Sequence, residues 1–494
     1  MKKIYKMMIV YIYLPILIFI LGWINILIAI PLVAVMFISL LFAIKSFEDK
    51  KLGDKEYKPT YITKYEYITE ALIALCIFSA FFTFCGHNDL FPQDFDWHKH
   101  HAIFYDLMDK KWPVVYNQNN SLLTYYLGGY IIPSFIAKIF FGSRLVLKIA
   151  ITLWNSVGMT LVYFFICEFI GIKRKQRMLI LLFMLTFSGV TNLGSFIYVH
   201  IDGSEMVAFK WIDIHKIKVH FASNFDALRG AFQHVIAPWI SCCLFLGNRR
   251  KYNIYVIIAI PLLFWATFGF FYLAIILLVY FIVDLIKSKK KLDVIKNAFS
   301  KENLLMLPIF AVIFVYLSGN IFAEKPINMG FKIYNPLDNV LFFSIFMLSE
   351  FVLYFIFLFK KNKNDHLYWI CFSELFFVSI FSIGLYNDFC SRGSIPARFI
   401  LMFFIIEQIY SWKIINWRNI ATMILFGISL FNTIREFKYI CNISKENYQN
   451  QTYICDNYKS FEGYAGNPNV REDEAYNYFT MNYEDSLFYK ISRH

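Results

Sequence analysis

The sequence predicts an all-α, polytopic integral membrane protein with about 13 transmembrane helices and short external juxtamembrane helices. Three observations support this fold class. Of the 494 residues, 58% are hydrophobic and 20% are aromatic. The mean hydropathy of +0.51 is well above the average for soluble domains. The apolar residues form long runs, and short clusters of Lys and Arg recur between these runs as they do in cytoplasmic loops.

The charge and cysteine content narrow the functional classes. The net charge of +13 comes from basic clusters between apolar runs, so we expect no nucleic-acid partner. No glycine-rich nucleotide-binding loop is present. Most of the nine cysteines fall inside apolar runs, where they behave as small core residues. Cys441 and Cys455 in the polar tail form a candidate disulfide if that tail lies in an oxidising space.

The first element is an apolar stretch, Tyr5–Ile44, which has twice the length that one crossing needs. A turn at Gly22–Asn25 divides it into two helices. The stretch is too long for a cleaved signal peptide, so both helices are expected to be retained. Lysines on both sides place the two ends in the cytoplasm. We assign residues 1–66 to this N-terminal pair and the loop that follows it.

The next crossing, Tyr67–Cys85, brings the chain to the external face. The later crossings are predicted from apolar runs that alternate with basic clusters. They are Leu145–Ile170, Met178–Tyr198, Ala231–Leu246, a pair within Tyr252–Ile286, Leu304–Phe322, Val340–Phe359, Leu367–Leu385, Ile395–Tyr410 and Ile420–Ile434.

One apolar run, Leu122–Phe141, does not fit the alternation. It would have to begin and end outside, so we interpret it as an interfacial or re-entrant helix interrupted by Gly128, Gly129 and Pro133. If it does cross, the basic cluster at residues 173–177 lies outside, against the orientation rule. Beyond residues 1–66, the predicted units are 67–247, 248–434 and a polar tail, 435–494, expected as a small appended domain or a flap.

The stretch Phe91–Pro113, FPQDFDWHKHHAIFYDLMDKKWP, concentrates charged residues between two apolar runs. Asp94 and Asp96 are close to a crossing. A carboxylate at the water–lipid boundary can take a proton from the hydroxyl or amine group of an acceptor molecule. The alternative is that Asp94, Asp106 and Asp109 are solvated or cap short helices. Asp96 heads the cluster DWHKHH and is the stronger catalytic candidate.

The positions just after Trp97 hold His98, Lys99, His100 and His101, and two interpretations of these residues remain open. On a helix, His98 and His101 share one face, which suits a divalent cation or an anion. No second histidine or cysteine pair lies close by, so a phosphate contact by Lys99 and a histidine such as His100 is the favoured interpretation. A solvated helix face is the remaining possibility.

The second external segment, His200–Gly230, contains further candidates. It has three acids that could act in proton transfer: Asp202, Glu205 and Asp226. Asp226, Arg229 and Gln233 would share nearly one helical face leading into a crossing that also contains His234. An ordinary entry from a loop into a helix explains the same pattern.

The turn Tyr386–Ser394 carries an arginine between two apolar runs. Arg392 at such a position is costly unless it meets a carboxylate or an anionic ligand. Asp388 is the nearby carboxylate, so the sequence allows a structural pair or a phosphate clamp.

Several stretches resemble the GT-C superfamily of polytopic membrane glycosyltransferases. They are DWHKHHAIFYDL, LLTYYLGGYIIPSFIAKIFFG, RLVLKIAITLWNSVG and NDFCSRGSIPARFILMF. The resemblance implies a GT-C-like fold and a sugar donor linked to polyprenyl phosphate. It implies that Asp96 matches the carboxylate of the first external loop and Arg392 a late phosphate-binding arginine. The two extra N-terminal helices and Asn117–Ser121 depart from the family pattern.

The expected function is therefore transfer of a sugar from polyprenyl phosphate to a glycan, lipid or protein acceptor at the external face of a bacterial plasma membrane. The expected catalytic residues are Asp96, Asp94 and Asp226, and the donor phosphate is expected at Arg392, Lys99, His100 and Arg229. Substrate contacts are expected from Trp97, His98, His234, Asp202, Glu205 and Asp388. No cofactor is required, with a divalent cation as an alternative. A polysaccharide polymerase or ligase and a lipid or glycan transporter are the alternative functions.

Overall fold

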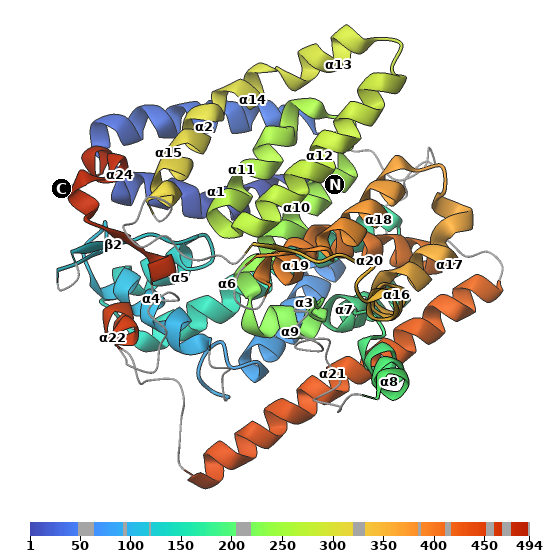
Figure 1. Cartoon of the computed structure of the whole chain (residues 1–494). Helices are drawn as coiled ribbons and strands as arrows, with labels where there is room; N and C mark the ends of the chain where they lie inside the picture. Colours follow the sequence, from blue (N-terminus) through green and yellow to red (C-terminus); the bar gives the residue numbers. More distant parts are fainter. Residues whose placement is uncertain are drawn as a thin grey trace.

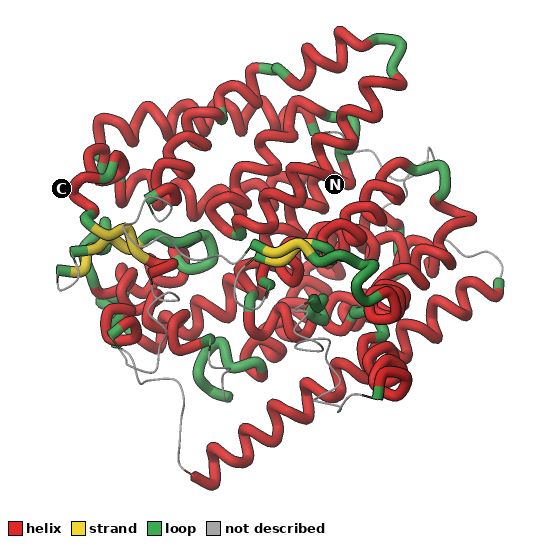
Figure 2. Tube along the Cα trace, viewed as in Figure 1, coloured by secondary structure: helices red, strands yellow, loops and turns green. Residues whose placement is uncertain are grey.

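The computed structural model describes ten parts of the chain, and most of them are helical (Figures 1 and 2). The described residues are 1–47, 64–91, 96–117, 120–203, 219–319, 331–383, 387–410, 416–450, 459–466 and 476–492. Within these residues, eight helices are long and apolar enough to cross a membrane, or up to 11 if each bent pair is one span. The protein is thus an α-helical, multi-pass membrane protein.

The predicted N-terminal pair is confirmed. Helix α1 covers Lys2–Trp23 and α2 covers Ile26–Ser46. Asn25 caps α2 by accepting a hydrogen bond from the backbone N–H of Leu27 at 3.0 Å. Helix α1 packs against α2, α5, α6, α10 and α11, whereas α2 packs on α1 and α14. The first helix therefore belongs to the core and is not a detached anchor.

The other long spans agree with the predicted runs. They are α3 (Lys64–Phe84), α6 (Arg144–Ile170), α12 (Thr267–Lys287), the Val340–Asn362 span formed by α16 (Val340–Met347), η4 (Leu348–Val352) and α17 (Leu353–Asn362), the pair α19 (Asp388–Gly393) and α20 (Ile395–Tyr410), and α21 (Trp417–Asn450). Helices α6 and α20 are the most enclosed, with 78% and 89% of their apolar windows buried, so the bundle is built around them.

Three predicted crossings are bent. The first bend is 42°, between α7 (Arg174–Thr186) and α8 (Thr191–Asp202). The second is 120°, between α9 (Asn224–Gly230) and the segment formed by η2 (Phe232–His234) and α10 (Ile236–Gly247). The third is 63°, where α13 (Lys291–Ala298) and α14 (Lys301–Leu305) meet α15 (Leu307–Ser318). Two apolar segments are shorter: η3 (Tyr252–Ile254) with α11 (Tyr255–Trp265), and α18 (His366–Val378). The predicted total of about 13 crossings would require both to cross as well.

The segment Leu122–Phe141 is helical only in its second half. The stretch after α3 folds into α4 (Trp97–Asp109), β1 (Val115–Tyr116) and β2 (Ser121–Leu123). Residues 124–130, which we call the tyrosine loop, then lead into α5 (Ile131–Ile139). Helix α5 has nine residues. It is therefore about 14 Å long, which is half of what a crossing needs.

The predicted boundary of the tail at residue 435 is wrong, because α21 continues without a break to Asn450. The described parts of the tail also pack into the fold instead of forming a separate unit. Strand β5 (Phe479–Met481) pairs antiparallel with β2 in the sheet β1-β2-β5. The remaining tail elements are α22 (Phe461–Ala465), which packs on α4, η5 (Tyr476–Tyr478), η6 (Tyr483–Asp485) and α24 (Leu487–Ile491), which packs on α15. A second sheet pairs β3 (Lys332–Ile333) with β4 (Phe381–Ser382).

Candidate functional site

Polar side chains from four separate segments meet near the start of α4. We call this group the polar cluster. Its members are Asp96, Lys99, His100, Tyr126, His234, Asp388 and Arg392. Asp96, Lys99 and His100 come from α4, Tyr126 from the loop before α5, His234 from η2, and Asp388 and Arg392 from α19.

Arg392 is the hub of one half of the polar cluster. Its Nη2 lies 3.3 Å from Asp388 Oδ1, one helical turn earlier on α19. Its Nη1 donates to the hydroxyl of Tyr126 at 3.4 Å and lies 3.3 Å from Nε2 of His234. The Tyr126 hydroxyl also lies 3.0 Å from His234 Nε2 and accepts from the hydroxyl of Tyr125. The predicted Asp388 pair therefore forms, and it leaves one side of the guanidinium facing the tyrosine loop.

The first turn of α4 makes the other half. Lys99 Nζ lies 2.7 Å from Asp96 Oδ1, and the Lys99 side chain is 10% exposed whereas that of Asp96 is 40% exposed. His100 Nδ1 lies 2.7 Å from the hydroxyl of Tyr130. The carboxylate of Asp96 is thus the accessible end of this half.

Close backbone packing holds the tyrosine loop in place. A Cβ on Gly128 would lie 2.4 Å from Cγ of Trp265, so only glycine fits against this ring. The Gly128 N–H donates to the carbonyl of Phe264 at 3.0 Å. The N–H of Tyr125 donates to the hydroxyl of Tyr316 at 3.1 Å. These contacts fix the direction in which Tyr126 and Tyr130 point.

The charges of the two halves act on each other. Burial alone would raise the pKa of the Asp96 carboxyl. The charges of Lys99 and Arg392 and the hydrogen bond from Lys99 outweigh it and lower this pKa to about 2. Asp96 is therefore a carboxylate at neutral pH, and the effect of Arg392 shows that the residue lies within electrostatic range.

Two histidines of α4, His98 and His100, are neutral at physiological pH. Burial, together with the charge of Lys99, lowers the pKa of His100 to about 3, although Asp96 opposes this shift. Burial also lowers the pKa of His98. A neutral His100 can exchange one hydrogen bond with Tyr130 and adds no charge to the polar cluster. The phosphate contact predicted for His100 stays a prediction, with a neutral ring as the hydrogen-bonding group.

Three predicted site residues make structural contacts outside the polar cluster. Trp97 is fully buried, stacks on Phe232 and donates its indole N–H to the carbonyl of Arg229 at 3.0 Å. Arg229 Nη2 lies 3.2 Å from Asp226 Oδ1 and 3.6 Å from Glu436 Oε2 on α21. The helix face predicted for these residues thus forms an ion-pair group that joins α9 to α21. The predicted roles of Trp97 as a substrate contact, Arg229 as a phosphate contact and Asp226 as a catalytic acid stay predictions, and the contacts of these residues lie outside the polar cluster.

The remaining predicted residues are placed as follows. His98 is buried in α4, next to the pair formed by His101 and Asp89 at 2.8 Å. Asp202 ends α8, a helix that packs on α16 and α21. Asp94, Glu205 and Cys455 lie outside the described residues.

Asp106 is neither solvated nor a helix cap. It is 1% exposed, and its Oδ2 accepts from the Tyr116 hydroxyl at 2.7 Å and from the Phe461 N–H at 2.8 Å. Lys110 lies 3.3 Å from its other oxygen. This carboxylate therefore joins the first loop to the tail, a contact that only the folded chain reveals.

The sequence prediction missed the tyrosines of the site. Tyr125, Tyr126 and Tyr130 surround Arg392 and His100, and Tyr478 from the tail packs on Tyr125 with ring centroids 4.3 Å apart. Burial raises the pKa of Tyr126, so its phenol keeps its proton and can donate. The signal in the sequence was YYLGGY, in which two glycines interrupt an apolar run beside three phenols.

Among the described residues, no group of three or more His, Cys, Asp or Glu side chains is arranged to hold a metal ion. Comparison of the chain with models of protein families, with curated proteins and with solved structures found no match. The chemistry of the polar cluster is therefore the basis for a functional conclusion. It offers an accessible carboxylate and two cations, with neutral hydrogen-bonding groups between them.

Proposed function

We propose that the chain is a membrane glycosyltransferase that moves a sugar from a polyprenyl-phosphate donor to an acceptor hydroxyl or amine. The observation that carries this proposal is the meeting of Asp96, Lys99 and Arg392 in one polar cluster. The tyrosine loop joins the two halves, because Tyr126 accepts from Arg392 and Tyr130 contacts His100 in the first turn of α4, although Asp96 and Arg392 are almost 300 positions apart in the chain.

The residues suit the charges of this reaction. The bond between the anomeric carbon and the phosphate oxygen breaks, and the acceptor oxygen or nitrogen bonds to that carbon. The acceptor proton moves to Asp96, which serves as general base. The polyprenyl phosphate leaves with added negative charge, which Arg392 and Lys99 stabilise and the Tyr126 hydroxyl contacts. We take the direct displacement to invert the configuration of the sugar.

The ion pair of Lys99 with Asp96 gives donor binding a second role. A carboxylate with a pKa of about 2 is a weak base at neutral pH. A donor phosphate competes for Lys99 and draws it away from Asp96. Asp96 then loses its strongest stabilising partner and becomes more basic when the donor is present.

The direct test is donor cleavage by the full chain in lipid vesicles. Radiolabelled polyprenyl-phosphate hexose is supplied with a membrane extract as a source of acceptors, and release of polyprenyl phosphate is measured. We expect Asp96→Asn to lower the rate by about 10²–10⁴-fold with donor binding retained, as for loss of a general base. Arg392→Ala is expected to weaken donor binding.

Asp109→Asn is the matched control, because Asp109 lies on the same helix with half of its side chain exposed and outside the polar cluster. It should keep the wild-type rate. Wild-type turnover in Asp96→Asn, or retention of sugar configuration in the product, contradicts the proposal.

A second candidate is a polysaccharide ligase or polymerase, because such enzymes use lipid-linked glycans and depend on arginine and histidine. The approach of Arg392 to His234 at 3.3 Å favours this alternative. Under it, His234→Ala and Arg392→Ala abolish transfer while Asp96→Asn retains it. Asp96→Asn therefore separates the two functions, because it abolishes most turnover in the transferase and retains transfer in the ligase or polymerase.

A further inference from the structure

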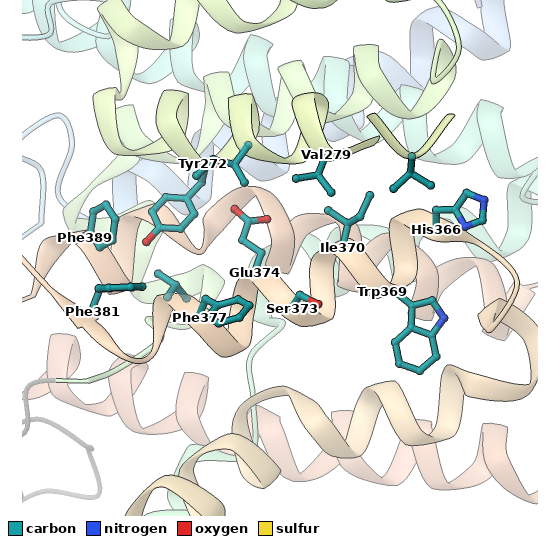
Figure 3. A pocket seen from close by; sticks show the side chains of 13 residues that line it. Tyr272, Val279, His366, Trp369, Ile370, Ser373, Glu374, Phe377, Phe381 and Phe389 are labelled. Atoms are coloured by element: carbon teal, nitrogen blue, oxygen red, sulfur yellow. The ribbon is translucent and has the colours of Figure 1, made fainter. Parts of the chain in front are cut away.

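A cavity of about 520 Å³ lies between α12 and α18, apart from the polar cluster. Its lining is apolar except for a few side chains, one of which is Glu374 (Figure 3). The volume is within the range of small-molecule sites in proteins. Figure 3 shows Glu374 extending from α18 toward α12, beside Tyr272.

Glu374 lacks the partners that buried carboxyl groups usually have. It is 7% exposed, and neither of its carboxyl oxygens has a hydrogen-bond partner among the residues that the structure describes. Its other neighbours include Cys242 and Cys371, which are not cations. An unpaired carboxylate is very costly in such surroundings, so they favour the neutral acid. That acid still leaves one donor and one acceptor unsatisfied in the cavity.

The cavity opens on the outside of the helix bundle. Four of its apolar lining residues are partly exposed: Ile275, Val279, Trp369 and Phe377. Two of them lie in the middle of α12, a helix that can cross a membrane. The opening therefore faces the lipid acyl chains and not water.

We propose that this cavity binds a lipid alcohol, with its hydroxyl paired to Glu374 and its apolar chain along α12 and α18. In a bilayer the apolar tail of the alcohol alone gives little preference for the cavity, because the surrounding lipid tails are as apolar as the lining. The hydrogen bonds to Glu374 select the ligand. A hydroxyl both donates and accepts, as the neutral acid requires, whereas an amine would bring a charge with its own desolvation cost.

Dicyclohexylcarbodiimide tests the site, because this apolar reagent reacts with protonated carboxyl groups in apolar surroundings. The carboxyl oxygen adds to the central carbon of the reagent while the carboxyl proton moves to a nitrogen. The O-acylisourea then rearranges to an N-acylurea, and no atom is lost. Peptide mass spectrometry of the full chain in vesicles therefore locates the modified residue.

We expect labelling at Glu374 and none in Glu374→Gln. Glu350 is the internal control, because it is equally buried but accepts a hydrogen bond from Thr191 at 2.6 Å. Ile370→Trp, which fills the cavity and keeps Glu374, should slow labelling about tenfold. Equal labelling of Glu374 and Glu350, or faster labelling of Glu374 by a water-soluble carbodiimide, overturns the site.

Competition tests the ligand class. Dodecanol is expected to slow labelling of Glu374 about tenfold, the effect of one additional hydrogen bond, while dodecane has no effect. Equal protection by dodecane, stronger protection by dodecylamine, or no protection by dodecanol overturns the assignment to an alcohol. The assay needs no turnover, so its outcome is independent of the proposed transferase reaction.

Discussion

The ion pair between Lys99 and Asp96 sets the charge state of the candidate site. Burial and the lysine act on the pKa of the same carboxyl in opposite directions, and the lysine, together with Arg392, prevails. The pair is three residues apart on α4, so the helix itself holds the two groups together. The reactivity of Asp96 therefore depends on what competes for Lys99.

We predict that Lys99→Gln raises the pKa of Asp96 from about 2 toward the ordinary value of about 3.9. The substitution removes a positive charge and a hydrogen bond, both of which favour the carboxylate. The acid carbonyl band of ¹³C-labelled aspartate in infrared spectra, assigned with Asp96→Asn, measures the change. Lys110→Gln should leave this band unchanged, because Lys110 pairs with Asp106. An unchanged Asp96 titration in Lys99→Gln argues against the electrostatic account.

The same shift affects stability at low pH. Since the folded-state pKa lies below the unfolded one, Asp96 stabilises the fold above about pH 4, and this contribution is lost as the pH falls toward 2. Lys99→Gln removes most of that dependence. Comparison of the acid unfolding curves of the two proteins checks the sign.

At the scale of elements, the tyrosine loop depends on one close approach. A Cβ on Gly128 would overlap the ring of Trp265. This ring is buried, and its indole N–H donates to the carbonyl of Ile12 at 3.0 Å. We predict that Gly128→Ala costs about 1–3 kcal/mol, as for an overpacked core. Gly427→Ala is the control, because nothing lies within 4 Å of a Cβ at that position. Equal thermal stability of the two variants would contradict this account.

The sequence pattern predicted which runs are helices but not how they break. Gly22–Asn25 identified the turn between α1 and α2, because a polar cap residue there is a local signal. The tyrosine loop was predicted as helix, because its apolar run hides a structure set by Trp265 and Tyr316 far along the chain. Asp96 and Arg392 were predicted from their polarity at a membrane boundary, whereas Tyr126 and Tyr478 were missed because phenols are common in apolar runs.

The contact between the first loop and the tail is a second interaction that joins separate elements. Asp106 is buried and accepts from Tyr116 and Phe461, whereas Asp109 is exposed on the same helix. We predict that Asp106→Ala destabilises the protein by about 3 kcal/mol, because it leaves two buried donors unsatisfied. Asp109→Ala should cost much less. Thermal unfolding of both variants in one detergent measures the difference.

At the scale of the whole molecule, the tail closes the fold on itself. Strand β5 pairs with β2, the Asn25 N–H donates to the carbonyl of Ile491 at 3.0 Å, and Phe488 packs on Phe19. The last described residues thus contact both the turn after α1 and the first loop (Figure 1). Composition predicted a separate polar tail, because pairing with a distant strand leaves no local signature. The chain is consequently one structural unit from its first helix to its last.

The orientation of that unit can be tested through the segment Leu122–Phe141. Since α5 is about 14 Å long, we predict that it does not cross, so residues 90 and 141 lie on the same side of the membrane. Trp265, just before α12, packs on Gly128 of the same segment, so Lys289 beyond the other end of α12 lies on the opposite side. In a background lacking Cys76, Cys441 and Cys455, an impermeant maleimide should label Leu90→Cys and Phe141→Cys from one side and Lys289→Cys from the other. If residues 90 and 141 react from opposite sides, the segment crosses the membrane. The polar cluster has members before and after this segment, so the topology proposed for the chain would then have to change.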